Sequence, residues 1–202
     1  MDLAFFTLSQ IDSHLQKYAS ESISNIKFSK NDDELWIGWI FGKFITSRIR
    51  KECLLGLPVK ENAGKLSLYQ ILKDNLVEDK NNFDVAIIAK DTIKNGKIVD
   101  GSYFYRIQIK RYKSQNPNTD DFINFVKDKF LNHYAPDKGL NCVILMEPGF
   151  KIDKIKLEKF VNNSTFNLAN IWITGYYYNQ KFDPYLMPIF PKFTKEIWRP
   201  ST

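Results

Sequence analysis

Three polar side chains in the middle of the chain have the types and spacing that metal-assisted phosphodiester hydrolysis needs. Gln108 and Lys110 lie two residues apart in the run YFYRIQIKRY, and Asp84 lies in the earlier apolar run FDVAIIA. In an extended strand, residues two apart point to one face, so Gln108 and Lys110 share a face. If the two runs pair, Asp84 projects from the neighbouring strand toward both. The sequence therefore predicts that a carboxylate, a carboxamide and an ammonium group meet.

These groups suit a site that works with a divalent cation. The Asp84 carboxylate is a hard oxygen ligand for Mg²⁺ or Mn²⁺, and the Gln108 carbonyl oxygen is a neutral, weaker one. The cation polarises the phosphoryl oxygen and activates water. Lys110 orients or deprotonates that water, or stabilises charge in the transition state. The alternative is an ordinary half-exposed strand, where an Asp opposite a Lys forms a surface ion pair contributing under about 1 kcal/mol.

The same runs resemble a known motif. FDVAII followed by YRIQIKRYK is similar to the PD-(D/E)XK nuclease superfamily, and within it to the QxK variant of Mrr-type restriction endonucleases, where Gln replaces the second acidic residue. The resemblance implies that Asp84 is the motif aspartate and a metal ligand. It implies that Gln108 takes the second ligand position and that Lys110 is the catalytic lysine. It spans residues 35 to 178.

The sequence also departs from the family pattern. Phe83 replaces the motif proline, and the stretch from Asp84 to Gln108 is longer than the minimal motif. The family usually adds an acidic residue from a preceding helix, and spacing singles out none of the candidates Glu34, Glu52 and Glu78. A neutral Gln108 and an unassigned acid lower the negative charge available to a metal. They leave a second interpretation, a nuclease fold that no longer cuts and binds nucleic acid or a protein partner.

The segments around the motif predict the elements that must position it. Runs rich in β-branched and aromatic residues predict strands over 83–89, 103–112, 141–147 and 170–178. A turn at Lys94–Lys97 joins the first two as a hairpin. Amphipathic segments predict helices over 119–134, with Thr119 as the N-cap, and over 151–163. The order from Phe83 is therefore β-β-α-β-α-β.

The first part of the chain predicts helices. Apolar residues at near-helical spacing predict a helical opening over residues 2–19. A second helix is expected from about Leu35 to Leu55, with Asp32 or Asp33 as its cap. Residues 65–76 fit either a helix or a strand, and an irregular Pro-rich tail is expected from Asp183.

Together with the resemblance, these elements predict an α/β fold. It is a restriction-endonuclease-like three-layer α-β-α core with a central mixed sheet of α-β-β-β-α-β type and N-terminal helices. Length favours a single domain over residues 1–202. Within it we expect an N-terminal helical extension over 1–34, the nuclease-like core over 35–178 and an irregular tail over 179–202.

The charge pattern favours a polyanionic partner. The formal net charge is +6 and the pI is about 9.1, which suits phosphate binding by counterion release. Basic residues alternate with tyrosines after the motif, so nucleic-acid contacts are predicted at Arg106, Arg111, Tyr112 and Lys113. The expected substrate is double-stranded DNA, which restriction and defence enzymes cut. Because cutting both strands usually takes two active sites, a homodimer is a possible assembly. The same charge is typical of a solvated basic surface or of an unrelated protein with an acidic partner.

The remaining features limit the class of protein and its cellular location. Cys53 and Cys142 lack CxxC partners, so a structural zinc site is not expected. They fit two buried thiols in a reducing compartment, with one disulfide left open. The N-terminus lacks a basic region before its apolar stretch, and no apolar run reaches a membrane span of about 20 residues. A cytoplasmic protein without membrane contact is therefore expected. His14 and His133 are expected at helix surfaces, and the aromatic cluster Trp172, Tyr176, Tyr177 and Tyr178 is expected to pack in the core rather than on bases.

Overall fold

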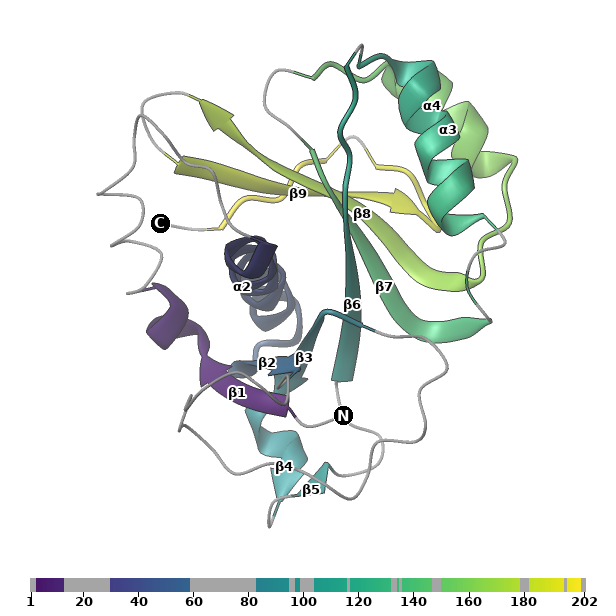
Figure 1. Ribbon diagram of the computed structural model, residues 1–202. Coiled ribbons are helices and arrows are strands. Elements are labelled where there is room, and N and C mark those ends of the chain that lie inside the picture. The colour runs from purple at the N-terminus through teal and green to yellow at the C-terminus, as the bar shows by residue number, and fades with distance from the viewer. Residues whose placement is uncertain are drawn as a thin grey trace. The chain divides into compact units, whose positions relative to one another are not determined.

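The computed structural model describes residues 3–12, 30–58, 83–94, 97–98, 104–115, 117–131, 134, 136–146, 150–178, 182–194 and 196–200. The chain is an α/β protein with a seven-stranded, mixed, open sheet flanked by helices (Figure 1). In their order across the sheet, the strands are β1 (Leu3–Thr7), β2 (Cys53–Pro58), β3 (Val85–Ala89), β6 (Phe104–Arg111), β7 (Asp137–Leu145), β8 (Leu168–Tyr178) and β9 (Phe182–Phe190). The longer helices described are α2 (Lys30–Ile49), α3 (Thr119–Phe130) and α4 (Lys154–Asn162). The predicted α/β class is confirmed.

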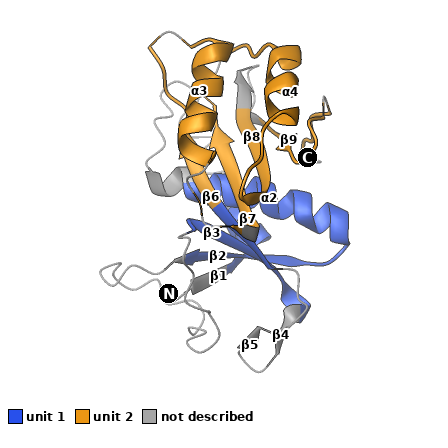
Figure 2. Ribbon diagram, turned by 90° about the vertical axis from the view of Figure 1, so that its right-hand side faces the viewer, with its two compact units in different colours: residues 1–107 blue, residues 108–202 orange. Residues whose placement is uncertain are grey.

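The chain divides into two compact units, Met1–Ile107 and Gln108–Thr202, which Figure 2 colours separately. The boundary falls inside β6, whose first half pairs with β3 in the first unit. Because one strand contributes to both units, the predicted single domain stays a prediction.

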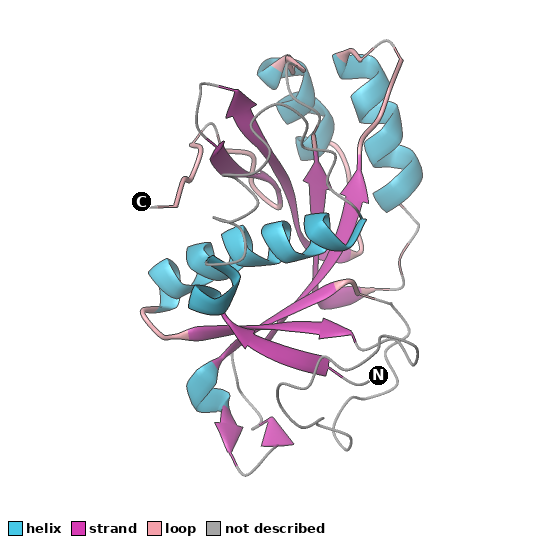
Figure 3. Cartoon of the chain, turned by 60° about the vertical axis from the view of Figure 1, so that its left-hand side comes forward, coloured by secondary structure: helices cyan, strands magenta, loops and turns pink. Residues whose placement is uncertain are grey.

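In the first unit, α2 packs on β2 and β3. This helix has 20 residues and is the long helix in Figure 3. A broad stripe of its side chains is buried: Trp36, Ile37, Ile40, Phe41, Phe44 and Ile45. Gly38 lets the helix approach the sheet closely, because a Cβ there would lie 2.4 Å from Leu55 Cδ1 and 2.9 Å from Val85 Cγ1. This packing fixes the position of β3.

The predicted helical opening over residues 2–19 is wrong at its start. Residues 3–7 form β1, which pairs antiparallel with β2 from Leu3↔Pro58 to Thr7↔Leu54, and only residues 8–12 are helical within the described part. Five residues of the sequence LAFFT are too few to show a helical period reliably, and aromatic residues favour a strand that has a partner. The N-terminal segment therefore extends the sheet.

The second helix is displaced from its expected range of Leu35 to Leu55. It begins at Lys30, so Asp32 and Asp33 lie inside its first turns and do not cap it. It ends at Ile49, and Arg50 follows with a positive φ of 54°, a left-handed conformation that commonly terminates helices. The leucines after Cys53 belong to β2.

The two motif runs are neighbouring strands, as predicted. β3 pairs antiparallel with β6, from Val85↔Ile107 to Ile88↔Phe104. The turn at Lys94–Lys97 does not join them directly, however. Its flanks form a separate two-stranded sheet, β4 (Ile93–Lys94) and β5 (Lys97–Ile98), after a 3₁₀ turn at Lys90–Thr92. The connection is long enough to hold a ribbon of its own.

In the second unit, β7 pairs parallel with β8, and β8 pairs antiparallel with β9. The helices α3 and α4 lie side by side, and α4 also contacts β9 (Figure 1). Lys127 places its Nζ 5.6 Å from the centre of the Phe160 ring. The predicted helices over 119–134 and 151–163 and the strands over 141–147 and 170–178 are therefore present, with bounds shifted by a few residues.

The N-cap of α3 is Asn118 and not Thr119. The Asn118 side chain accepts a hydrogen bond from the Asp121 backbone N–H at 3.0 Å. Thr119 has another function, because its Oγ1 accepts a hydrogen bond from the Asp153 backbone N–H at 2.9 Å. Two adjacent residues of good capping type explain the one-residue error.

The expected irregular tail is also wrong, because residues 182–190 form β9 at one edge of the sheet. Leu186 exchanges two backbone hydrogen bonds of 2.9 Å with Trp198, so its N–H points away from β8. Pro184 and Pro188 lie two residues to either side of Leu186. Their missing N–H groups would therefore also point away from β8. Prolines at these positions leave the pairing with β8 intact.

Candidate functional site

Asp84 lies at a bend directly before β3 and is half-buried. Its backbone N–H donates a hydrogen bond of 2.8 Å to the carbonyl oxygen of Ile107, the residue that also pairs with Val85. Asp84 is therefore attached to the neighbouring strand one residue before β3 begins. This attachment fixes the backbone that carries the Asp84 side chain.

The residue before Asp84 is part of the core. Phe83 is 4% exposed and packs edge to face on Phe104 of β6, with ring centroids 6.4 Å apart. This contact holds the backbone on the N-terminal side of Asp84, while the buried Val85 holds the other side. An aromatic residue at the position of the motif proline therefore has a clear structural role.

Gln108 and Lys110 lie on the second half of β6, in the second unit. Gln108 is 8% exposed and is one of three buried polar side chains among the described residues, with Asn141 and Thr174. Lys110 is half-buried, and Ile107 on the other side of the strand is fully buried. Burial does not alternate along this stretch, because Ile107 and Gln108 are both buried while Ile109 and Lys110 are both half-buried, so the shared face of Gln108 and Lys110 stays a prediction. Since Asp84 belongs to the first unit, the meeting of all three side chains stays a prediction.

Tyr112 does not have the role predicted for it. It is 2% exposed, and its ring packs against Phe122, Phe125 and Phe150, with centroids 5.1 to 5.3 Å away. Its hydroxyl donates a hydrogen bond of 2.6 Å to the Asp121 carboxylate. A ring enclosed in this way has no open face for a nucleic-acid base. The partner Asp121 was not identified from the sequence, where only its place in the first turn of α3 marked it.

The electrostatics of this pair follow from burial and hydrogen bonding. Burial, and then the bond to Asp121, raise the pKa of Tyr112 to about 12. Hydrogen bonds from Tyr112 and then from Ser114 lower the pKa of the Asp121 carboxyl. The carboxylate and the neutral phenol are therefore the stable forms over the physiological range.

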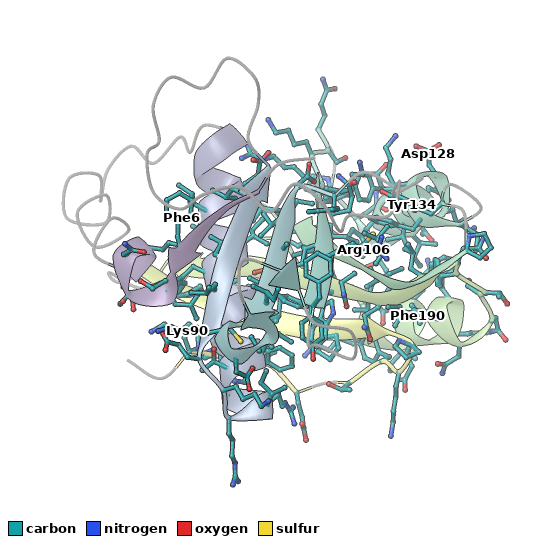
Figure 4. All side chains as sticks on the ribbon, turned by 90° about the horizontal axis from the view of Figure 1, so that it is seen from below. Phe6, Lys90, Arg106, Asp128, Tyr134 and Phe190 are labelled. Atoms are coloured by element: carbon teal, nitrogen blue, oxygen red, sulfur yellow. The ribbon has the colours of Figure 1, made fainter. Side chains whose placement is uncertain are left out.

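The predicted basic contacts differ in exposure. Arg106, labelled in Figure 4, is half-buried on β6, whereas Arg111 and Lys113 are exposed on either side of the buried Tyr112. Alternation along an extended chain explains this pattern, because burying Tyr112 turns its two neighbours outward. The predicted role of Arg111 and Lys113 as nucleic-acid contacts stays a prediction.

The structure distinguishes the candidates for the additional acidic residue by their location and exposure. Glu34 lies in α2 and is half-buried, whereas Glu52 is exposed and pairs with Lys90 at 3.0 Å (Figure 4 labels Lys90). Glu78 lies outside the described residues, as do His14, His133 and the segment 65–76. No group of three or more His, Cys, Asp or Glu side chains gathers within the described part of the chain. Of the described candidates, Glu34 is the one on a helix that packs against β3.

The cysteines and the aromatic cluster belong to the core. Cys53 and Cys142 are buried and free, and burial raises the pKa of the Cys53 thiol. Trp172 is 9% exposed, in keeping with the predicted packing role, while the side chains of residues 176–178 lie outside the description. Among the described helices, none has both the length and the apolar character required to cross a membrane.

Comparisons with protein-family models, with curated proteins and with solved structures find no significant match to this chain.

Proposed function

We propose that this protein is a divalent-metal-dependent nuclease that hydrolyses phosphodiester bonds in double-stranded DNA, as restriction and defence enzymes do. The observation that carries the proposal is the hydrogen bond at the bend before β3, in which the Asp84 N–H binds the carbonyl of Ile107, the residue immediately before Gln108. This bond attaches the backbone of the candidate aspartate to β6, the strand that carries the QxK sequence. The antiparallel pairing of β3 with β6 supports the proposal in the same way.

The order of the elements gives separate support. Apart from the small ribbon β4–β5, the chain runs α2, β2, β3, β6, α3, β7. This is the α-β-β-β-α-β order of the proposed restriction-endonuclease-like core, in which helices cover both faces of a mixed sheet. The parallel pairing of β7 with β8 and the antiparallel pairing of β2, β3 and β6 agree with such a sheet.

The donor set fits Mg²⁺ or Mn²⁺. The Asp84 carboxylate and the Gln108 amide oxygen are both hard oxygen donors, and such ions complete their coordination with water and phosphate oxygens. When bound, the cation would supply the positive charge that polarises the phosphoryl group. Lys110 would donate hydrogen bonds to the scissile phosphate or hold the attacking water. Arg111 and Lys113 would bind the phosphates on either side of the cut.

Plasmid cleavage with matched variants tests the proposal. The wild-type chain should nick or linearise DNA only with Mg²⁺ or Mn²⁺, and Asp84→Asn and Lys110→Met should each lower the rate by at least about 100-fold. Lys90→Met is the control, because it removes a lysine from an exposed ion pair with Glu52. Intact plasmid with the wild-type chain across both metals, or equal losses in Lys90→Met, contradicts the nuclease.

A nuclease fold that binds DNA without cutting it is the second candidate, and the neutral, buried Gln108 favours it. One carboxylate and one amide give a metal little negative charge. Calorimetry separates the two candidates. Metal binding that disappears in Asp84→Asn supports the nuclease, whereas salt-sensitive DNA binding with no metal uptake supports the binding module.

A further inference from the structure

The end of β6 is held by one buried side chain, Tyr112. Its backbone N–H donates a hydrogen bond of 3.0 Å to the carbonyl of Leu145, which continues the attachment to β7 one residue past the strand. Its ring is enclosed by aromatic side chains of α3 and of the segment before α4. Its hydroxyl reaches the Asp121 carboxylate at 2.6 Å. Backbone, ring and hydroxyl thus each have a separate partner.

The partner Asp121 belongs to an unusually well-connected turn. Four successive residues at the start of α3 each make a specific contact. Asn118 caps the helix through the Asp121 N–H, Thr119 accepts from the Asp153 N–H, and Asp120 pairs with Lys156 at 2.6 Å. Asp121 is the fourth, and Ser114 also bonds to its carboxylate. The carboxylate that holds Tyr112 is therefore itself fixed.

Lys110 is the second-to-last residue of β6, and Tyr112 is the first residue after that strand. The position of a side chain on a strand depends on the local twist and pleat of the backbone. At the end of a strand, these depend on what fixes the last residues. A hydrogen bond that fixes Tyr112 therefore also limits the directions that the Lys110 ammonium group can take.

We propose that Tyr112 and Asp121 are positioning residues that hold the end of β6 and thereby aim Lys110 at the scissile phosphate. The inference rests on the proposed nuclease function for its catalytic part. Neither residue touches the reacting atoms. The pair, named here the Tyr112–Asp121 anchor, makes Lys110 effective by reducing its freedom, since small misplacements of a catalytic group cost much of the rate.

The first test needs no activity. In Tyr112→Phe the ring packing stays and only the hydroxyl is lost, so amide hydrogen exchange over residues 110–113 should become about tenfold faster. Tyr134→Phe is the matched control, because it removes the same atom from a buried tyrosine that stacks on Phe130 in the same unit. Exchange over residues 110–113 that is unchanged in Tyr112→Phe, or equally faster in both variants, overturns the inference.

The second test is kinetic. Per folded molecule, Tyr112→Phe should lower kcat for DNA cleavage by about 10- to 100-fold while the DNA concentration at half-maximal rate stays unchanged. Asp121→Asn keeps an oxygen that accepts a hydrogen bond from Tyr112, so its kcat should fall less than that of Asp121→Ala. A general loss of folding would not produce this difference between the two variants. Faster exchange with an unchanged kcat refutes the positioning role. If the wild-type chain cuts no DNA, the proposed function and the catalytic part fail together, and exchange alone decides whether the anchor holds β6.

Discussion

Replacing Gly38 by alanine tests how tightly α2 is packed on the strand that carries Asp84. The new Cβ would lie 2.4 Å from Leu55 Cδ1 and 2.9 Å from Val85 Cγ1, both in fully buried side chains. Valine has one strongly preferred rotamer in most settings, so it cannot turn aside easily. Either the helix or β3 must move.

The expected magnitude is the balance of two effects. Alanine in place of glycine inside a helix stabilises it by about 1 kcal/mol. Overpacking a well-filled core costs about 1 to 3 kcal/mol. The net effect of Gly38→Ala is therefore a loss of up to about 2 kcal/mol in the free energy of unfolding. For an m-value of about 2 kcal/mol/M, a loss of about 1 kcal/mol lowers the urea midpoint by about 0.5 M.

Gly42, one turn along the same helix, supplies the control. Its Cβ would meet Leu8 Cδ2 at 2.6 Å, and Ile87 only at an ordinary contact distance of 3.5 Å. The end of the Leu8 side chain is flexible, and Leu8 is 9% exposed, whereas Leu55 and Val85 are fully buried. Gly42→Ala should therefore be neutral or stabilising by up to about 1 kcal/mol, so the two substitutions differ in sign.

Equilibrium urea unfolding of both variants measures whether each substitution raises or lowers the free energy of unfolding. If Gly38→Ala is as stable as Gly42→Ala, or more stable than wild type, α2 does not approach β3 as closely as described. A second readout concerns function. Because Val85 follows Asp84, a displaced β3 should weaken metal binding in calorimetry more in Gly38→Ala than in Gly42→Ala.

Three further outcomes are expected. Asn118→Ala removes the cap of α3 and should destabilise the chain by about 1 kcal/mol in urea unfolding, whereas Thr119→Ser keeps an oxygen for the Asp153 N–H and should cost less. The pKa of Tyr112 in the folded chain is raised to about 12, so its contribution to stability is complete below the ordinary tyrosine pKa of about 10 and is lost as the pH rises toward 12. At alkaline pH, the free energy of unfolding should therefore fall less steeply with pH in Tyr112→Phe than in the wild type. Equal slopes would contradict the buried phenol. Lys90→Ala breaks an ion pair whose side chains are 57% exposed, so thermal unfolding should show a loss under about 1 kcal/mol.

The main strands and helices from Phe83 to Tyr178 were predictable because their signals are local. The runs FDVAIIA and YFYRIQIKRY are dense in residues that favour strands, and α3 shows a clear apolar face. The two ends of the sheet were not predictable in the same way. β1 is five residues long and owes its conformation to β2. β9 contains prolines, and prolines predict irregular structure. They are compatible with this strand because the N–H groups that they lack would point away from β8, which the sequence does not show.

The candidate site rests on residue types that the sequence shows and on an arrangement that it does not. Alternation placed Gln108 and Lys110 on one side of a strand without any knowledge of the fold. The hydrogen bond from Asp84 to Ile107 joins residues more than 20 positions apart, and no local signal predicts it. Tyr112 was misread for the same reason. Tyr112 follows Gln108 and Lys110 at the same two-residue spacing, but α3 and Phe150 cover it, and their placement is a long-range property.

The burial of Gln108 gives a physical reason for the neutral residue at this position. A glutamate with 8% exposure would be strongly desolvated, and without a cation its charged form would be costly. Gln108→Glu should therefore lower the stability of the metal-free chain at neutral pH and recover part of it with Mg²⁺, because binding to the folded state stabilises it. Urea unfolding with and without Mg²⁺ measures both effects, and Glu158→Gln, on the half-buried surface of α4, controls for general charge effects. A Gln108→Glu chain that loses stability and gains none from Mg²⁺ would show that Gln108 does not face a cation, and would leave the DNA-binding module as the better account.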